Sequence, residues 1–152
     1  MFDVREYSPS EVVMTFGGYR VEGWERIVIK RIHPSFRFVA GIRGQNTRVS
    51  LGNSAAEVEV ILTQTSPTNS VFAQIVALDE QYGTGRIELT IKDVLSGEKF
   101  QSTQAYLESP AEQSFSSDIS ERSWKLVCLS SNSDMGTGGA LGSLVDRVTS
   151  FF

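Results

Sequence analysis

The chain has 152 residues, of which 40% are hydrophobic and 21% charged, and 14 Lys and Arg stand against 18 Asp and Glu. This length predicts one domain with a sizeable hydrophobic core, and the composition argues against a largely disordered chain. The net charge of −4 disfavours a protein that grips nucleic acid through counterion release, which needs a concentrated basic face. It leaves open a surface past which DNA slides without binding.

No run of about eighteen apolar residues occurs, so we expect no membrane span. Residues 1–6 lack the apolar core of a signal peptide. Because Cys128 is the only cysteine, we expect neither an intramolecular disulfide nor a cysteine metal cluster. These features predict a protein made in the cytoplasm.

The first third of the chain is predicted to contain extended segments. Residues 1–10 form an extended arm, and residues 11–16 form a short strand that the Gly17-Gly18 pair ends. A second extended run covers residues 19–23. The high apolar density of residues 27–32 predicts a strand that is covered on both faces.

Residues 33–55 show little core pattern and many turn-forming residues, which predicts a long hairpin loop. Loops of this length in a compact domain usually have a function or are ordered by a partner. Arg37, Arg43 and Arg48 lie here and no acidic residue does. A cationic loop on an acidic body indicates contact between copies of the chain, and the alternative is a solvated hairpin.

The central stretch has the clearest local pattern. Residues 57–63 alternate between apolar and polar side chains, as in a half-buried strand. Ser66 as N-cap and Pro67 as the first helical residue predict a helix, in which Val71, Phe72, Ile75, Val76 and Leu78 recur at helical spacing.

Three further strands are predicted after this helix. The first covers residues 86–92, and a Ser96-Gly97 turn leads into the second, which continues to Leu107. The last covers residues 119–129 and places Trp124, Leu126 and Cys128 on one face. Residues 130–152 form a Gly/Ser-rich extension, in which Leu141, Leu144, Val145 and Val148 indicate a short amphipathic helix or a segment that orders on assembly.

Residues with catalytic chemistry are scarce. His33 has no triad pattern around it, Cys128 lies in an apolar strand, and Glu57 and Glu59 are explained by a solvated sheet face. The Gly-rich residues 136–142 lack the following strand and acid of a dinucleotide site. We therefore expect no enzyme activity, no metal and no cofactor.

In their order and spacing, these features resemble the major tail tube protein of contractile-tailed bacteriophages. The likeness covers residues 11–129. It is carried by Gly18–Ile32, Phe38–Gly41, Arg48-Val49, Asn53-Ser54, Val58–Leu62, Thr65–Asn69, Asp79, Ile87–Asp93, Ser96-Gly97, Tyr106-Leu107 with Pro110, and Trp124. The extension from residue 130 departs from the family pattern.

The resemblance implies a mainly β (α+β) fold, an antiparallel β-barrel or sandwich with one internal helix, over residues 1–129. It implies a virion protein whose copies form hexameric rings that stack into a tube, through which DNA passes during ejection without specific binding. The implied partners are further copies of the chain and the sheath, tape-measure and baseplate proteins, with no membrane. Arg37, Arg43, Arg48 and Val49 of the 33–55 loop would then contact a neighbouring subunit or ring.

The sequence is also compatible with two alternatives. One is a baseplate or tail-terminator component, which forms single rings rather than long tubes. The other is a β-sandwich that binds a sugar or peptide, with Trp24, Tyr82 or Trp124 as stacking platforms.

Overall fold

The computed structural model describes residues 6–135, so the predicted helical segment at residues 141–148 and the Gly-rich residues 136–142 lie outside the described residues. One helix, α1, covers Thr68–Tyr82, and a short 3-10 helix covers Pro9–Glu11. The strands are β1 Val12–Phe16, β2 Tyr19–Arg20, β3 Trp24–Arg31, β4 Phe36–Ala40, β5 Asn46–Ser50, β6 Ala56–Thr63, β7 Ile87–Asp93, β8 Lys99–Leu107, β9 Glu121–Cys128 and β10 Asn132–Asp134.

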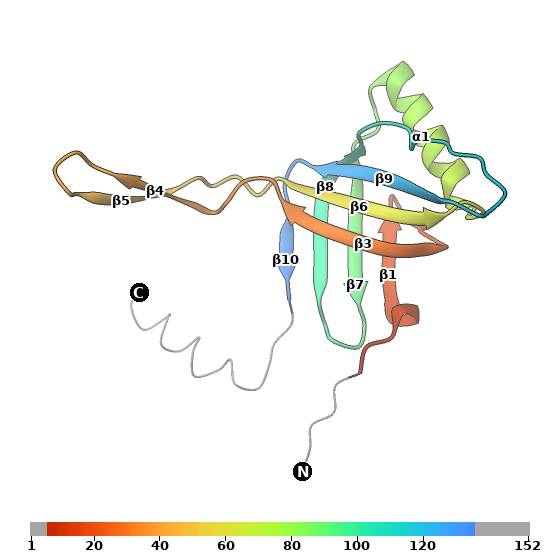
Figure 1. Cartoon of the computed structure of the whole chain (residues 1–152), viewed down its shortest axis with the longest axis horizontal. Coiled ribbons are helices and arrows are strands. Elements are labelled where there is room, and N and C mark those ends of the chain that lie inside the picture. Colours follow the sequence, from red (N-terminus) through yellow and green to blue (C-terminus); the bar gives the residue numbers. More distant parts are fainter. Residues whose placement is uncertain (1–5, 136–152) are drawn as a thin grey trace, which may run out of the picture.

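Antiparallel pairing joins eight strands in the order β2-β1-β7-β8-β9-β6-β3, with β10 added to β8. Strand β8 divides this sheet into two layers, because β10 pairs with its first residues and β9 with its last. In Figure 1 the layer of β9, β6 and β3 crosses over the layer of β1, β7 and β8. The predicted mainly antiparallel β fold with one internal helix is confirmed, although β2 and β3 end the sheet and no closed barrel forms in the described part of the chain.

The core lies between the two layers, where each strand contributes alternate side chains. In β6, for example, Val58, Val60 and Leu62 are fully buried, as the alternation in the sequence predicts. The facing side chains come from β1, β7 and β8, and Trp124, Leu126 and Cys128 of β9 complete the core. Cys128 is thus a buried apolar residue, as predicted, and burial raises the pKa of its thiol.

Helix α1 closes one end of this core. The helix begins one residue later than predicted: Pro67, not Ser66, is its N-cap, and no side chain caps it by a hydrogen bond. The Ser66 hydroxyl accepts a hydrogen bond from the Thr68 backbone N–H (3.2 Å) just before the helix. The Phe72 ring makes edge contacts with Phe16 of β1 and Trp124 of β9, at centroid distances of 6.0 and 5.5 Å. The helix therefore links the two layers through a single aromatic cluster.

Three features differ from the sequence prediction. Strand β3 is not covered on both faces: it ends the sheet, and Val28, Ile29 and Ile32 are at least 40% exposed. Leu78 of α1 is also exposed, since only one side of the helix meets the core. Finally, the polar residues Asn132–Asp134 form strand β10, which the sequence did not predict.

Candidate assembly surface

Strands β4 and β5 pair only with each other and form a two-stranded hairpin that extends away from the body of the molecule (Figure 1). We call residues 33–55 the arm. Its strands continue β3 and β6, because the Ile32 N–H donates to the Ala55 carbonyl and the Leu51 N–H to the Ser35 carbonyl, both at 3.1 Å. Residues 24–63 therefore form one long antiparallel ribbon, with its outer part clear of the core.

The predicted contact residues occupy three different places on the arm. Arg37 and Val49 are direct cross-strand partners on one face, and Val49 is half-buried. Arg48 lies on the other face, where its guanidinium is 3.5 Å from the centre of the Phe36 ring. Arg43 lies at the tip, between Ile42 and Gly44. The structure thus brings Arg37 and Val49 together and separates Arg43 from both.

The arm also exposes large apolar side chains, which sequence reasoning missed as contact candidates. Phe38 is 67% exposed and Ile42 fully exposed, and Phe36, Val39 and Leu51 are partly exposed. Two-stranded hairpins are marginally stable alone in water, and clustered exposed apolar side chains are typical of surfaces that proteins use for contacts. The sequence signal that could have identified this apolar surface is the two-residue spacing of Phe36 and Phe38, which puts both rings on one face of a strand in an otherwise turn-rich stretch.

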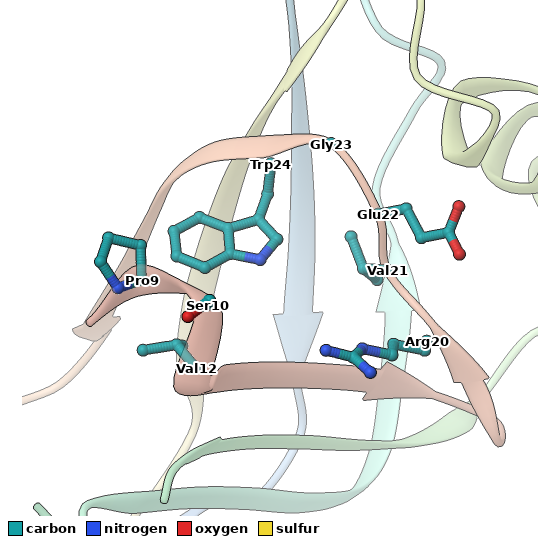
Figure 2. A pocket seen from close by; sticks show the side chains of 8 residues that line it. All are labelled: Pro9, Ser10, Val12, Arg20, Val21, Glu22, Gly23 and Trp24. Atoms are coloured by element: carbon teal, nitrogen blue, oxygen red, sulfur yellow. The ribbon is translucent and has the colours of Figure 1, made fainter. Parts of the chain in front are cut away.

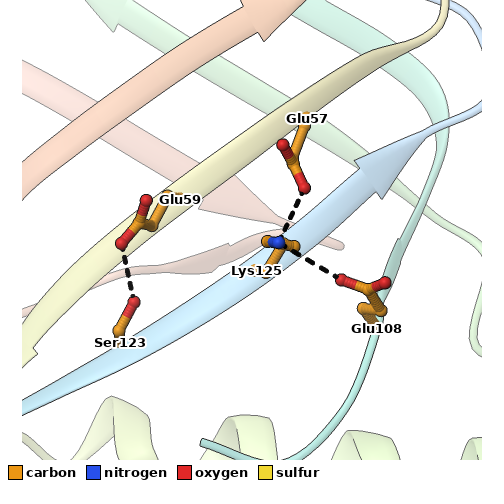
Figure 3. A network of polar contacts seen from close by, with 5 residues as sticks. All are labelled: Glu57, Glu59, Glu108, Ser123 and Lys125. Carbon is orange, nitrogen blue, oxygen red and sulfur yellow. Dashed lines mark hydrogen bonds and ion pairs between the residues drawn. The ribbon is translucent and has the colours of Figure 1, made fainter. Parts of the chain in front are cut away.

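Charge is divided between the arm and the body. The arm has three arginines and no acid, which leaves 11 Lys and Arg against 18 Asp and Glu in the rest of the chain. Several of these acids lie on the outer face of β6 and β9 (Figure 3). There the Lys125 ammonium is 2.9 Å from the Glu57 carboxylate and 3.8 Å from that of Glu108, and the Ser123 hydroxyl donates to Glu59.

The same layer carries a pair of neighbouring carboxyl groups, Glu25 of β3 and Glu121 of β9. A hydrogen bond with Glu121 raises the pKa of Glu25, and burial and the negative charge of Glu121 add to the effect. Cations lie on this face as well: Lys30 of β3 is the cross-strand partner of Glu57, and Arg26 is that of Ile61.

A cavity of about 440 Å³ lies beside β3, and Figure 2 shows the side chains that line it. They are Pro9, Ser10, Val12, Arg20, Val21, Glu22, Gly23 and Trp24. The other two proposed stacking aromatics are elsewhere: Trp124 is buried and donates its indole N–H to Asn69, and Tyr82 is exposed at the end of α1. The three aromatic side chains therefore do not form a common ligand platform.

Within residues 6–135, no group of three or more metal-ligating side chains occurs. None of the helices described is long and apolar enough to cross a membrane. His33 is exposed at the base of the arm.

The fold is shared with components of contractile injection systems. The tube-terminating cap of the anti-feeding prophage superposes with a TM-score of 0.66, over 90% of this chain and 96% of that one, at 11% identity. The sheath/tube terminator of the extracellular system called PVC gives a TM-score of 0.66, over 86% and 98% of the two chains, at 9% identity. A chain of the PVC sheath–tube complex gives 0.58 at 10% identity, over 86% of this chain and 92% of that one.

In sequence, the chain is similar to structural protein ORF10 of Pseudomonas phage KPP10, with 29% identity over 100 residues. The matched region is 64% of this chain and spans 58% of the length of that phage protein. No protein-family model matches the sequence.

Proposed function

We propose that this protein is a non-enzymatic structural component of a phage tail, and that it forms a ring that terminates the tail tube. The observation that carries the proposal is the superposition on two terminators, which is closer (TM-score 0.66) than that on the sheath–tube complex chain (0.58). The similarity to a phage structural protein supports a place in a virion. The major tube subunit, which the sequence alone favours, becomes the second candidate.

A ring needs contacts between copies, and the chain offers surfaces of the right kind. Strands β2 and β3 leave two unpaired sheet edges, which are a hazard in a monomer and a joint in a closed ring. The cationic arm reaches outward from an acidic body, so that one copy can dock on the next through opposite charges. In this proposal Arg37, Arg43, Arg48 and Val49, with the exposed Phe38 and Ile42, contact a neighbouring subunit or ring.

We further propose that the outer face of β9, β6 and β3 lines the lumen. Its carboxylates, including Glu57, Glu59 and Glu108, offset the cations of the same face, so that DNA phosphates meet no concentrated basic surface and DNA passes without specific binding. The proposed partners are copies of this chain, the tube, the sheath and the tape-measure and baseplate proteins. We also propose that the ring is a hexamer. Residues 1–129 are then the assembling unit, and residues 130–152 are an extension of it.

The proposal is tested by measuring the size of the assembly over a series of protein concentrations, with negative-stain electron microscopy and light scattering. A terminator forms discrete rings whose size stays constant as the concentration rises. A tube subunit forms stacks that lengthen with concentration, and this result would favour the second candidate. A strict monomer, alone and with tube protein added, would contradict both.

The role of the arm is tested with Arg43→Glu/Arg48→Glu. We expect a folded monomer that no longer forms rings or no longer binds tube ends. The matched control is Arg86→Glu/Lys92→Glu, which changes the net charge equally on exposed residues outside the arm. Normal assembly of the arm variant, or equal loss in the control, would show that the arm's positive charge has no special role.

A further inference from the structure

The connection between β8 and β9, residues 108–120, has no helix or strand of its own, and we call it the end loop. It joins β9 at Glu121, which lies opposite Thr63, the last residue of β6. The arm joins the other end of β6, next to Ala56. The end loop and the arm therefore lie at opposite ends of β6, and Figure 1 shows them at the two ends of the molecule's long axis.

The charged side chains of the end loop are all acidic. They are Glu108, Glu112 and Asp118. Glu112 and Asp118 are exposed, and within residues 6–135 neither carboxylate has a hydrogen bond or ion pair. Glu121 follows the loop and shares a hydrogen bond with Glu25 of β3, after which comes the exposed cation Arg26. This end of the molecule thus offers carboxylates that a cationic partner can neutralise.

Two large apolar side chains project from the same loop. Phe115 is 79% exposed and Ile119 is 74% exposed. The guanidinium of Arg122 lies 5.5 Å from the centre of the Phe115 ring and donates to the Ser114 carbonyl at 3.1 Å. Because Arg122 itself is buried, the exposed ring is backed by a fixed group. Aromatic side chains held in this way are typical anchors of protein interfaces.

Hydrogen bonds hold the second half of the end loop. The Gln64 side-chain oxygen accepts from the backbone N–H and the hydroxyl of Ser120, at 3.0 and 3.1 Å, and the Gln64 N–H donates to the Ser120 carbonyl at 3.0 Å. The Ser116 hydroxyl donates to the Asp118 carbonyl at 2.9 Å. A loop that is already ordered loses little conformational entropy when a partner binds to it.

The arm has the complementary properties. It carries three arginines and no acid, and Phe38 and Ile42 are its most exposed apolar side chains. From Ile32 to Ile42 an extended strand spans about 30 Å, so the tip reaches well beyond the body. Because the arm and the end loop lie at opposite ends of one chain, these two surfaces can meet only between copies.

A groove of about 630 Å³ between β3 and the layer of β7, β8 and β10 is the competing surface for the arm. Three cations line it, Arg26, Arg31 and Lys99, together with four acids. These cations oppose the arginines of the arm, whereas the end loop has none. The charges therefore favour the end loop over the groove.

We propose that the arm of one copy docks on the end loop of the next copy, with its apolar tip against Phe115 and Ile119 and its arginines facing Glu112 and Asp118. This inference rests on the proposed function, because it names the surface of the neighbouring copy that the arm binds. The two surfaces differ, so the contact repeats head to tail and closes into a ring when the rotation between copies fits.

Disulfide trapping between two chains tests the contact whether or not rings form. One chain carries Ile42→Cys, the other carries Ile119→Cys, and the two are mixed under oxidation. The matched control for the second chain is Val94→Cys in the turn after β7, where the side chain is also exposed, at 54%. The native Cys128 is buried and stays unreacted.

A disulfide needs Cα atoms about 4.4–6.8 Å apart, so we expect covalent pairs between positions 42 and 119 to form at a much lower concentration than pairs between 42 and 94. Equal linkage at the two positions, or none at either, would overturn the inference.

A charge-swap series separates this inference from the proposed function. Glu112→Arg/Asp118→Arg should abolish rings, and adding Arg43→Glu/Arg48→Glu to the same chain should restore them, because the opposite charges then face each other again. The matched control is Glu88→Arg/Glu98→Arg, an equal change of net charge on exposed residues outside the end loop. We expect this control to form normal rings.

Normal rings with Glu112→Arg/Asp118→Arg, or no recovery in the chain with all four substitutions, would overturn the inference and leave the proposed ring intact. Loss of rings in the control would also overturn it, because Glu98 lines the groove. If the original chain forms no rings at all, the proposed function fails, and the disulfide result alone then decides the inference.

Discussion

The aromatic cluster that joins α1 to both sheet layers gives the sharpest stability prediction. Phe72 is fully buried, and its ring meets Phe16 at 86° and Trp124 at 78°, both edge-on. Phe72→Ala removes the whole ring, and such substitutions in cores lower the free energy of unfolding by about 3–5 kcal/mol. For a chain of this size, where 1 kcal/mol corresponds to about 2–4 °C, the melting temperature should fall by roughly 6–20 °C.

Phe72→Leu separates ring contacts from simple burial. It keeps most of the apolar volume but loses two edge-to-face pairs, each worth about 0.5–1.5 kcal/mol, so we expect a loss of about 1–3 kcal/mol. The control is Leu78→Ala on the same helix, where the side chain is 53% exposed and the expected change is within about 0.5 kcal/mol.

Urea unfolding followed by circular dichroism measures all three variants against the original chain. The expected order of destabilisation is Phe72→Ala, then Phe72→Leu, then Leu78→Ala. If Phe72→Ala were no more destabilising than Leu78→Ala, the helix would not be held by this cluster. If Phe72→Leu matched the original chain, burial alone would account for the role of Phe72.

Two predictions concern titrating groups. Burial raises the pKa of the Cys128 thiol in the folded protein, so the stability that this thiol contributes is complete below the pKa of the unfolded thiol. It is lost as the pH rises through the pKa of the folded thiol. Cys128→Ala should therefore remove this loss of stability at alkaline pH, as measured by urea unfolding at a series of pH values, and an unchanged pH profile would contradict this assignment. The hydrogen bond with Glu121 raises the pKa of Glu25, so this pair stabilises the folded protein at low pH and stabilises it less as the pH rises. The melting temperature of Glu25→Gln should therefore vary less between acidic and neutral pH than that of the original chain.

Local patterns in the sequence predicted most of the strands and the helix. The alternation in residues 57–63 and the start of a helix near Ser66-Pro67 are signals that adjacent residues carry by themselves. The structure confirms the strand and the helix, which begins at Thr68 with Pro67 as its N-cap. The existence of the arm followed from the same reasoning, since residues 33–55 combine turn formers with little core pattern.

Features that depend on contacts between distant residues were not predictable in this way. The apolar density of β3 indicated cover on both faces, but density does not reveal whether a strand lies inside a sheet or at its end. Strand β10 consists of Asn, Ser and Asp, which disfavour strands, and it exists because β8 offers an unpaired edge beside it. Likewise, the sequence grouped Arg37, Arg43 and Arg48 by charge, whereas their placement on two faces and a tip depends on the register of β4 and β5.

The continuity of the arm with β3 and β6 has a mechanical consequence. A pull on the tip loads both strands of the ribbon, and the share that enters β3 passes to β6, its one neighbour in the described sheet. The load of both strands then reaches the ladder between β6 and β9, which runs from Ala56 opposite Cys128 to Thr63 opposite Glu121. There the force acts along the strands and all the rungs resist it together, so traction on the arm is borne by the best-buried strand pair of the molecule.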